Sequence, residues 1–345
     1  MAVRERRAKR SAPGLKDVAA HAGVSVATVS RVINGGPYIT ERVQALVLAS
    51  MQALGYEPHA LAQSLRTGQT QSIGYVVSDI ANFLFSTIAR GIDDTLQPQT
   101  YTMVLATSRS DPEHEIAVIR HLQRRRVDGL ILSLADETNS QLNSYLAKQH
   151  VPLVLLDRDL PGLAADRVVV DHASGITAAV EHLLQLGHRR IGLITGTNQT
   201  RPGREIRQAF EHACQAHALI TPPEYLAVGP PSEAFGLEAL KRMLALPQPP
   251  SAIIAGGAQI SIGVLYALRQ HSITLPTQLS LIAYDDTDAT ELYTPSICVV
   301  ARDVYAIGQV AASLLLERLQ DPQRPYQTQL IPTQLIIRGS TGAAS

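Results

Sequence analysis

Polar side chains that could bind a small molecule recur where apolar, strand-like runs of the sequence end. In chain order they are Asp79, Asn82, Asp157, Arg158, Asp171 and Asp285. Carboxylate and amide oxygens accept hydrogen bonds from hydroxyl and N–H groups, which suits sugars, nucleosides or bases. Aspartate at a strand end is also a common helix cap or turn residue, so these positions have a purely structural interpretation as well.

Patterns of nucleophiles and metal ligands do not indicate an enzyme. The chain has no phosphate-binding loop of the GxxxxGK[ST] type, no GxSxG, no HExxH and no Cys/His cluster with metal spacing. No GxGxxG follows the first strand-like run of the body, so dinucleotide binding has no support. We therefore predict no catalytic residues, no metal site and no cofactor.

The charge of the chain is divided unevenly along its length. Thirty Lys/Arg and thirty acidic residues give a formal net charge of zero. Residues 1–68 hold nine Lys/Arg and four acids, a charge of +5, which leaves 21 and 26 for the rest, a charge of −5. A basic head on an acidic body is typical of nucleic-acid binding. The alternative is a solvated basic tail, because five of the nine cations precede Ser11.

The composition also excludes several classes of protein. A hydrophobic fraction of 45% over 345 residues is too high for a disordered chain. No apolar run approaches the roughly 20 residues that span a bilayer, and the basic N-terminus lacks the apolar core of a secretory signal. We expect a cytoplasmic protein with no membrane partner.

Three helices at 15–22, 26–33 and 41–54 are predicted for the basic head. Gly23 and Gly55 are placed to end helices, and Ser25 and Thr40 to cap them. Short helices joined by a glycine turn and braced by a third helix form a helix-turn-helix, whose second helix enters the major groove. From composition alone, a small helical bundle without DNA-binding function stays an equal alternative.

From residue 73 onward, strand-like runs alternate with helical segments. Strands are expected at 73–80, 101–107, 128–134, 152–157, 167–171, 190–196, 252–256, 279–285, 297–301 and 330–337. Helices are expected at 83–97, 113–125, 138–149, 174–187, 203–217, 233–246, 260–271 and 304–320. This alternation predicts an α/β fold of doubly wound parallel sheets, which bind ligands at the carboxyl ends of their strands.

The segments LKDVAAHAGVSVATVSRVING and GYEPHALAQSLRTG closely resemble the DNA-binding head of the lactose/galactose repressor (LacI/GalR) family, and the resemblance continues to about Gly339. It implies a three-helix head, a hinge helix and a periplasmic-binding-protein-like core of two subdomains. The implied bounds are an arm at 1–14, the head at 15–57, the hinge helix and linker at 58–70, the core at 71–340 and a tail at 341–345. Subdomain one would span about 71–168 and 298–326, and subdomain two about 169–295 and 329–340.

The resemblance also implies which residues contact DNA. They are Ser25, Val26, Ala27, Thr28, Ser30, Arg31, Asn34, His59, Ala62 and Leu65. Arg31 can donate two hydrogen bonds to a guanine edge, and Val26 and Ala27 can contact a thymine methyl group. For Thr28 and Ser30 we prefer phosphate contacts. In the family, Leu65 aligns with a leucine that wedges between central base pairs, while small Ala62 lets paired hinge helices approach; ordinary packing is the alternative for Leu65.

In the core, the resemblance places an effector in the cleft between the subdomains. Phe85 matches an aromatic residue at the floor of that pocket, and Arg204 flanks a position where the family has an arginine but this chain has Ile206. Gly257-Ala258 stands where the family often has Asn-Asp, and Pro231 replaces an aromatic residue. The chain thus lacks a carboxylate, a guanidinium and a ring of the family's usual polyol site, and three alternatives stay open: a more apolar ligand, a differently charged ligand, or none. The effector classes that we expect are a sugar, nucleoside, purine or sugar acid.

These expectations together describe a transcriptional repressor. A homodimer would bind a near-palindromic double-stranded operator, with a small molecule altering the angle between the subdomains. The C-terminal RGSTGAAS carries no leucine heptads, which favours a dimer over a tetramer. Two alternatives are a constitutive DNA-binding regulator with a degenerate pocket and a solute-binding protein; the helix-turn-helix and the missing export signal oppose the latter.

Overall fold

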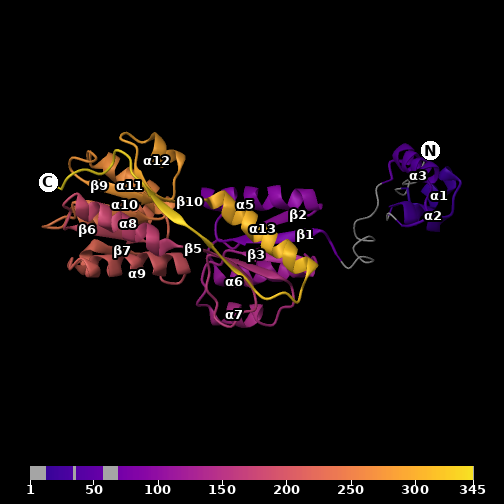
Figure 1. The fold of residues 1–345 in the computed structure, drawn as a ribbon, viewed down its shortest axis with the longest axis horizontal. Helices are drawn as coiled ribbons and strands as arrows, with labels where there is room; N and C mark the ends of the chain where they lie inside the picture. The colour runs from indigo at the N-terminus through magenta and orange to yellow at the C-terminus, as the bar shows by residue number, and fades with distance from the viewer. Residues whose placement is uncertain (1–12, 34–35, 57–68, 345) are drawn as a thin grey trace, which may run out of the picture. The chain divides into compact units, whose positions relative to one another are not determined.

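The computed structural model describes residues 13–33, 36–56 and 69–344 of the chain (Figure 1). The chain divides into two compact units, Met1–Thr70 and Gln71–Ser345. The predicted hinge helix at 58–66 and residues 1–12 of the predicted arm lie outside the described residues. Within the described residues, no helix combines the length and the apolar character needed to cross a membrane.

The head unit contains the three expected helices, α1 (Leu15–Ala22), α2 (Val26–Ile33) and α3 (Glu41–Leu54). Their bounds follow from local chemistry. Gly23 and Gly55 end α1 and α3 with φ angles of 64° and 62°, a left-handed conformation that glycine adopts without steric cost. The Ser25 and Thr40 hydroxyls accept hydrogen bonds from the first turns of α2 and α3. The helices bury a small core of Val18, Ala19, Ala22, Val29, Val32, Val47 and Tyr56.

The first lobe of the core, lobe one, is a six-stranded parallel sheet in the order β11-β5-β4-β3-β1-β2. Its strands are β1 (Ser72–Val77), β2 (Thr102–Thr107), β3 (Gly129–Leu132), β4 (Leu153–Leu156), β5 (Asp166–Val170) and β11 (Thr328–Ile331). Its helices are α5 (Phe83–Leu96), α6 (Pro112–Arg124), α7 (Ser140–Leu146) and α13 (Val304–Gln320), with a short 3-10 turn η1 (Gln97–Gln99). Helices α5 and α13 cover one face of the sheet, and α6 and α7 cover the other.

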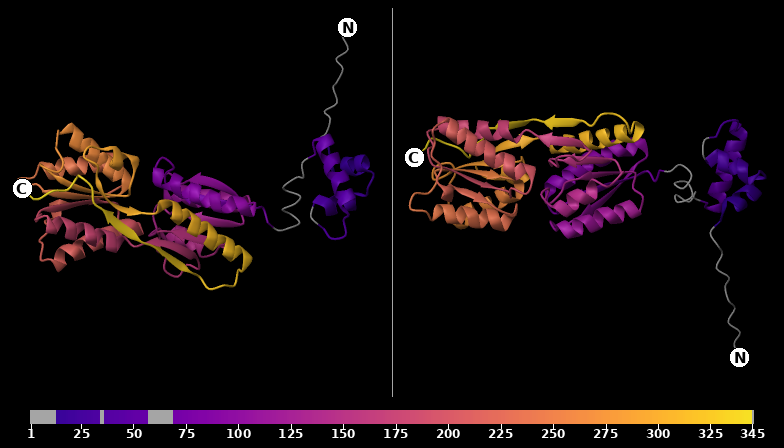
Figure 2. Two further views of the ribbon diagram at one scale, coloured as in Figure 1. Left: turned by 45° about the horizontal axis from the view of Figure 1, so that its top comes forward. Right: turned by 90° about the horizontal axis from the view of Figure 1, so that it is seen from below.

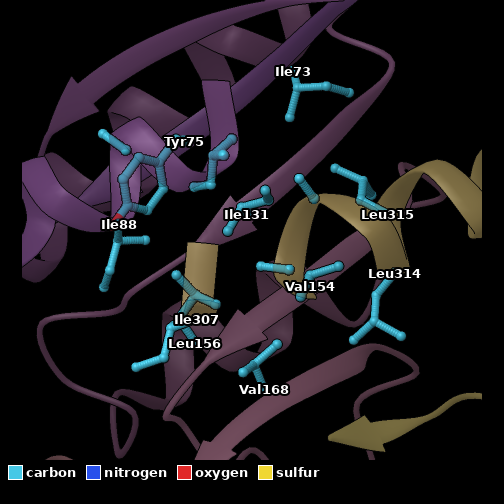
Figure 3. Close-up of a cluster of buried hydrophobic side chains, with 14 of the residues drawn as sticks. Ile73, Tyr75, Ile88, Ile131, Val154, Leu156, Val168, Ile307, Leu314 and Leu315 are labelled. Atoms are coloured by element: carbon cyan, nitrogen blue, oxygen red, sulfur yellow. The ribbon is translucent and has the colours of Figure 1, made fainter. Parts of the chain in front are cut away.

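Apolar side chains from the sheet and from two helices distant in sequence form the core on the α5/α13 face (Figure 3). Ile73 and Tyr75 of β1 point into it because alternate residues of a strand share one face. Helices α5 and α13 approach backbone to backbone at two glycines. A Cβ on Gly91 would lie 2.3 Å from the Tyr305 carbonyl oxygen, and one on Gly308 would lie 2.2 Å from that of Ile88. Glycine is therefore required at this crossing.

The second lobe, lobe two, repeats this architecture with the strand order β12-β10-β9-β8-β6-β7. Its strands are β6 (Ile191–Thr195), β7 (Leu226–Val228), β8 (Ala252–Gly256), β9 (Ser280–Tyr284), β10 (Cys298–Arg302) and β12 (Thr333–Ile336). Its helices are α8 (His172–Gln185), α9 (Arg201–Ala216), α10 (Glu233–Leu244), α11 (Ala258–Gln270) and α12 (Asp288–Leu292), with a 3-10 turn η2 (Pro223–Tyr225). Helices α8 and α9 pack on one face and α10 and α11 on the other.

The chain crosses between the lobes at Asp171, Asp303 and Pro332 (Figure 2).

The expected division into subdomains was wrong at two strands. Strand β10 belongs to lobe two because it pairs with β9 and β12, whereas β11 belongs to lobe one because it pairs with β5. The single strand expected at 330–337 is divided at Pro332, which has no N–H for a strand ladder. Strand β12 runs antiparallel to β10, an exception to the all-parallel expectation.

Candidate functional site

Helix α2 of the head presents one exposed and one buried side. Val29 and Val32 are buried against the other two helices, while Val26, Ala27 and Arg31 are exposed. Thr28 and Ser30 are half-buried between these sides. The exposed set contains a long cationic side chain and two small apolar ones, so this surface can both donate hydrogen bonds and contact a methyl group.

Ser25 has a local structural role at the start of α2. Its Oγ accepts a hydrogen bond from the Thr28 amide at 3.1 Å and lies 2.9 Å from the Thr28 hydroxyl. This is an N-cap, which holds the first turn of the helix in place. Four further predicted DNA contacts, Asn34, His59, Ala62 and Leu65, lie outside the described residues.

In the core, the buried carboxylate of Asp157 connects the two lobes. Asp157 follows β4 in lobe one, and its side-chain partners come from lobe two. Its Oδ2 accepts from His172 Nε2 at 2.9 Å and from Arg302 Nη1 at 3.3 Å. Its Oδ1 accepts from Arg201 Nη1 at 2.8 Å and from the Val170 amide of its own lobe at 3.2 Å. One side chain of lobe one is thus held by three side chains of lobe two.

Arg302, at the end of β10, extends this network to a second buried carboxylate. Its Nε donates to Asp285 Oδ1 at 2.8 Å and its Nη2 to Asp285 Oδ2 at 3.4 Å. The guanidinium carbon lies 5.4 Å from the centre of the Tyr284 ring, a cation–π contact. The Tyr284 hydroxyl lies 2.6 Å from His172 Nδ1. The predicted residues Asp157 and Asp285 are therefore brought together, through an arginine of the chain itself.

Asp157 and Arg302 keep their charges despite their burial. Burial raises the pKa of Asp157, but His172, Arg302 and Arg201 outweigh it and hold that pKa well below its ordinary value. Burial lowers the pKa of Arg302, but Asp285, Tyr284 and Asp157 together raise it above its ordinary value. Asp157 is therefore ionised and Arg302 is charged at neutral pH.

A second contact joins the lobes at Glu137, in the segment after β3. Its carboxylate pairs with Arg204 of α9, and its amide donates to the Gln199 carbonyl oxygen at 3.0 Å. The other Glu137 oxygen accepts from the Asp159 amide at 2.9 Å. Arg204, a predicted effector residue, thus pairs with a carboxylate of the opposite lobe.

The remaining predicted effector residues have structural partners. Asp79 accepts from the Ala81 amide, Asn82 caps α5 and Asp171 caps α8. Phe85 is 6% exposed and belongs to the core of lobe one. Arg158 donates to the carbonyl oxygens of Leu134 and Asp157 at 2.5 and 2.8 Å. The contacts of Asp79 and Asp171 match the turn and cap roles that the sequence also allowed for strand-end aspartates.

Sequence reasoning missed five members of these contacts: Glu137, His172, Arg201, Tyr284 and Arg302. A signal was present for Arg302, because it directly follows a predicted strand, as the predicted acids do. Arg201 and His172 begin helices that follow strands, a weaker signal shared by many surface residues.

An open groove of about 1120 Å³ lies beside the network, lined by both lobes. Phe83, Thr87 and Val304 line it from lobe one, and Arg302, Thr287 and Thr333 from lobe two. Of its lining residues, Arg302 also belongs to the Asp157 network, and none is among the predicted effector residues. No group of His, Cys, Asp and Glu side chains suited to a metal ion occurs in the part of the chain that the structure describes.

Glu115 of α6 supports the segment that carries Glu137, and we predict that it makes stability depend on pH. Its side chain is fully buried and accepts from the Ala135 amide at 3.1 Å. Burial raises its pKa from 4.5 to about 7, although the Ala135 amide, Ser108 and Arg158 oppose this and only Asp136 adds to it. Between these pH values the folded chain keeps a proton that the unfolded chain has released, so stability falls as the pH rises through 7.

Glu115→Gln should therefore be more stable than the wild type at pH 8, by about 1–3 kcal/mol, and should show little difference at pH 4. Urea denaturation at both pH values measures this. Glu113→Gln, an exposed position on the same helix, is the control and should change stability equally at both. A pH-independent difference for Glu115→Gln would contradict the interpretation.

Comparison with known proteins agrees with this architecture. Residues 14–59 match the family model "Bacterial regulatory proteins, lacI family", and residues 180–341 match "Periplasmic binding protein-like domain". The chain is 30% identical over 330 residues to the HTH-type transcriptional repressor PurR of Haemophilus influenzae (strain PittEE), covering 94% of this chain and 98% of that one. It is also 30% identical over 327 residues to the ribose operon repressor of Escherichia coli (strain K12), covering 94% and 99%.

Solved structures show the same fold over nearly the full length. A Lac repressor structure bound to ONPG in the repressed state matches with a TM-score of 0.85 at 27% identity, covering 96% of this chain and all of that one. The transcriptional regulator CelR in complex with cellobiose matches with a TM-score of 0.72 at 28% identity, covering 95% and 99%. The head followed by two α/β lobes is the expected fold class, which is therefore confirmed. The chain belongs to the lacI family of bacterial regulatory proteins, and it is a DNA-binding transcriptional regulator.

Proposed function

We propose that this protein is a transcriptional repressor that binds a near-palindromic operator as a homodimer and responds to a small molecule between its two lobes. The observation that carries the DNA-binding part is the exposed side of α2, with Val26, Ala27 and Arg31 beside buried Val29 and Val32. A helix that exposes its first turn and a cation in this way is suited to the major groove.

Arg31 is the base-reading residue in this proposal. Its guanidinium can donate two parallel hydrogen bonds to the O6 and N7 atoms of guanine. Val26 and Ala27 offer apolar contacts to a thymine methyl group, and Thr28 and Ser30 are assigned to phosphates. Asn34, His59, Ala62 and Leu65 complete the proposed DNA contacts from the segments outside the described residues.

Arg31→Ala should weaken binding to the preferred operator by about 1–3 kcal/mol and relax the preference at one base pair. The operator can be selected from random double-stranded DNA, and affinities measured by fluorescence anisotropy at one fixed salt concentration. Arg42→Ala removes an arginine of α3 that is also exposed, and it is the matched control, expected to change affinity evenly across sequences. If Arg31→Ala lost as much affinity for random DNA as for the operator, the base-reading role would be wrong.

The dimer has support from the exposed edge of lobe one. Strand β2 pairs with β1 on one side, and it is the end strand of its sheet. Its neighbouring residues Val104 and Leu105 point to opposite faces and are 36% and 38% exposed, so both faces of this apolar edge are partly open to solvent. An exposed apolar edge strand favours association with another chain, and a second copy supplies a self-complementary partner. Sedimentation equilibrium at micromolar concentration should give the mass of a dimer.

The small molecule is assigned to the region between the lobes, where both contribute buried polar side chains. Relatives of this chain have been solved with ONPG and with cellobiose, which supports a ligand site in this fold. Thermal shift over sugars, nucleosides, purines and sugar acids tests whether the protein binds one. A saturable shift supports an effector site.

A constitutive regulator is the second candidate, and two observations favour it. Ile206 is 2% exposed and packs in the core of lobe two, so it does not reach the cleft. Both carboxylates of the network, Asp157 and Asp285, are already paired with Arg302. A protein that bound its operator equally with and without every compound of a broad panel would support this candidate.

A further inference from the structure

Arg302 occupies the position at which a ligand would bind two buried carboxylates. Asp285 is 2% exposed and Asp157 is 7% exposed, and Arg302 donates to both. The Asp157 carboxylate has two other side-chain partners, Arg201 and His172. The ion pairs found for Asp285 within the described residues are all with Arg302. A cation at this point is therefore needed to compensate Asp285, since an unpaired buried carboxylate is strongly unfavourable.

The carboxylates are fixed, whereas the arginine is attached through a long side chain. Asp157 and Asp285 are short and sit at strand ends, where their amides donate to the carbonyl oxygens of Val168 and Val300 at 2.7 and 2.9 Å. Arg302 also lines the open groove of about 1120 Å³. Its guanidinium can therefore turn into the groove and become hydrated without any movement of the backbone, which neither carboxylate can do.

We propose that Arg302 is a built-in occupant of the effector site, and that the ligands of this site carry a planar cation with several N–H donors, such as a guanidinium or an amidinium. Such a group replaces Arg302 at Asp157 and Asp285 while Arg302 turns into the groove. This inference rests on the proposed function of the cleft as an effector site.

The chemistry of the site disfavours the other ligand classes. An anion would have to displace Asp157 from Arg201 and Arg302, which removes both arginine partners of a buried carboxylate. A neutral polyol can donate hydrogen bonds to Asp285, but it leaves that charge uncompensated once Arg302 has turned away. A multi-donor cation keeps both the charge balance and the paired hydrogen-bond geometry of the guanidinium.

The position of Arg302 also has a consequence for the lobes. Arg302 is part of lobe two and is held there by Asp285, but its Nη1 reaches Asp157 of lobe one. The chain therefore supplies one of the contacts that hold its lobes together without any ligand. Truncating Arg302 should open the lobes, and a free guanidinium ion placed between the carboxylates should close them again.

The test uses Arg302→Ala in the full chain, with methylguanidinium chloride as the probe. The distance between the lobes is measured by double electron–electron resonance between two spin labels. The labels are attached to cysteines introduced at the exposed positions Lys148 of lobe one and Gln270 of lobe two. The native Cys214 and Cys298 are buried and do not interfere with labelling. We expect a longer or broader distance in the variant and a saturable return to the wild-type distance at millimolar methylguanidinium. Arg338→Ala is the control, because Arg338 pairs with Asp286 inside lobe two. The spin-label distance in this variant should match that of the wild type at every probe concentration.

Two results would overturn the proposal. One is an Arg302→Ala protein that is folded by circular dichroism and keeps the wild-type distance without any probe. The other is an open variant whose distance does not respond to methylguanidinium, or responds equally to the same concentration of a neutral sugar. If Arg302→Ala did not fold, Arg302→Gln would take its place with the same expectations. These readouts involve no DNA, so they are independent of the operator test of Arg31→Ala.

Discussion

Replacing Asp157 with alanine should lower the free energy of unfolding of the core by about 3–5 kcal/mol and separate the lobes. The variant leaves Arg201 and Arg302 partly uncompensated and removes the acceptor of His172. Because each of these partners belongs to lobe two, their loss weakens the contact between the lobes as well as the fold. Urea denaturation followed by circular dichroism measures the first effect, and the spin-label distance measures the second.

Asp157→Asn distinguishes the effect of losing the carboxylate charge from the effect of backbone strain. Asp157 has a φ of 52°, a left-handed conformation that asparagine tolerates better than alanine does. The pKa of Asp157 is lower in the folded chain than in the unfolded chain, so its ionised form stabilises the fold above pH 3.8, the ordinary pKa of aspartate. The difference in unfolding free energy between the wild type and Asp157→Asn should therefore narrow as the pH falls below 3.8.

Asp286→Ala is the matched control, since its pair with Arg338 is partly exposed and lies within lobe two. Its effect should stay within about 1 kcal/mol. Equal losses for both alanine variants would refute the role assigned to Asp157.

A second large effect is expected at Asp166, at the start of β5. Its carboxylate is fully buried and accepts from Arg318 Nε at 3.0 Å and from the Gln327 amide at 2.8 Å. Arg324 Nη2 lies 3.3 Å from it. The same arginine, Arg318, donates to carbonyl oxygens at Pro322 and Pro325, so this network fixes the segment that joins α13 to β11.

Asp166→Ala should destabilise the core by about 3–5 kcal/mol, because it leaves Arg318, which is 4% exposed, without its carboxylate. All of these residues belong to lobe one, so the distance between the lobes should not change. That unchanged distance distinguishes this variant from Asp157→Ala. Asp321→Ala, an exposed position in the same segment that accepts from the Gln323 amide, is the control and should cost less than about 1 kcal/mol. A similarly small loss in Asp166→Ala would show that the buried pair contributes little.

The head shows how far local chemistry determines structure. The three predicted helices coincide with α1, α2 and α3 because each ends at a glycine or begins at a capping hydroxyl within a few residues of it. These interactions depend only on near neighbours in sequence. The exposed side of α2 also follows from periodicity, since Val29 and Val32 recur on the buried side.

The core shows where local chemistry is insufficient. Whether β10 and β11 belong to lobe one or lobe two depends on which distant strand offers a free edge, and both were assigned to the wrong lobe. Pro332 was a local sign of the last crossing, but a proline marks a break in a strand and does not tell which sheet each half joins.

The sequence by itself determined the family, the helix-turn-helix, the alternation of strands and helices, and the acids at strand ends, because each is encoded in residues close together along the chain. Only the tertiary structure decided what those acids contact. Arg201 and Arg302 lie 44 and 145 residues from Asp157, and they meet it because two sheets place the carboxyl ends of β4 and β10 at a shared boundary between the lobes. A carboxylate predicted to receive a ligand is thereby paired with the chain's own arginine.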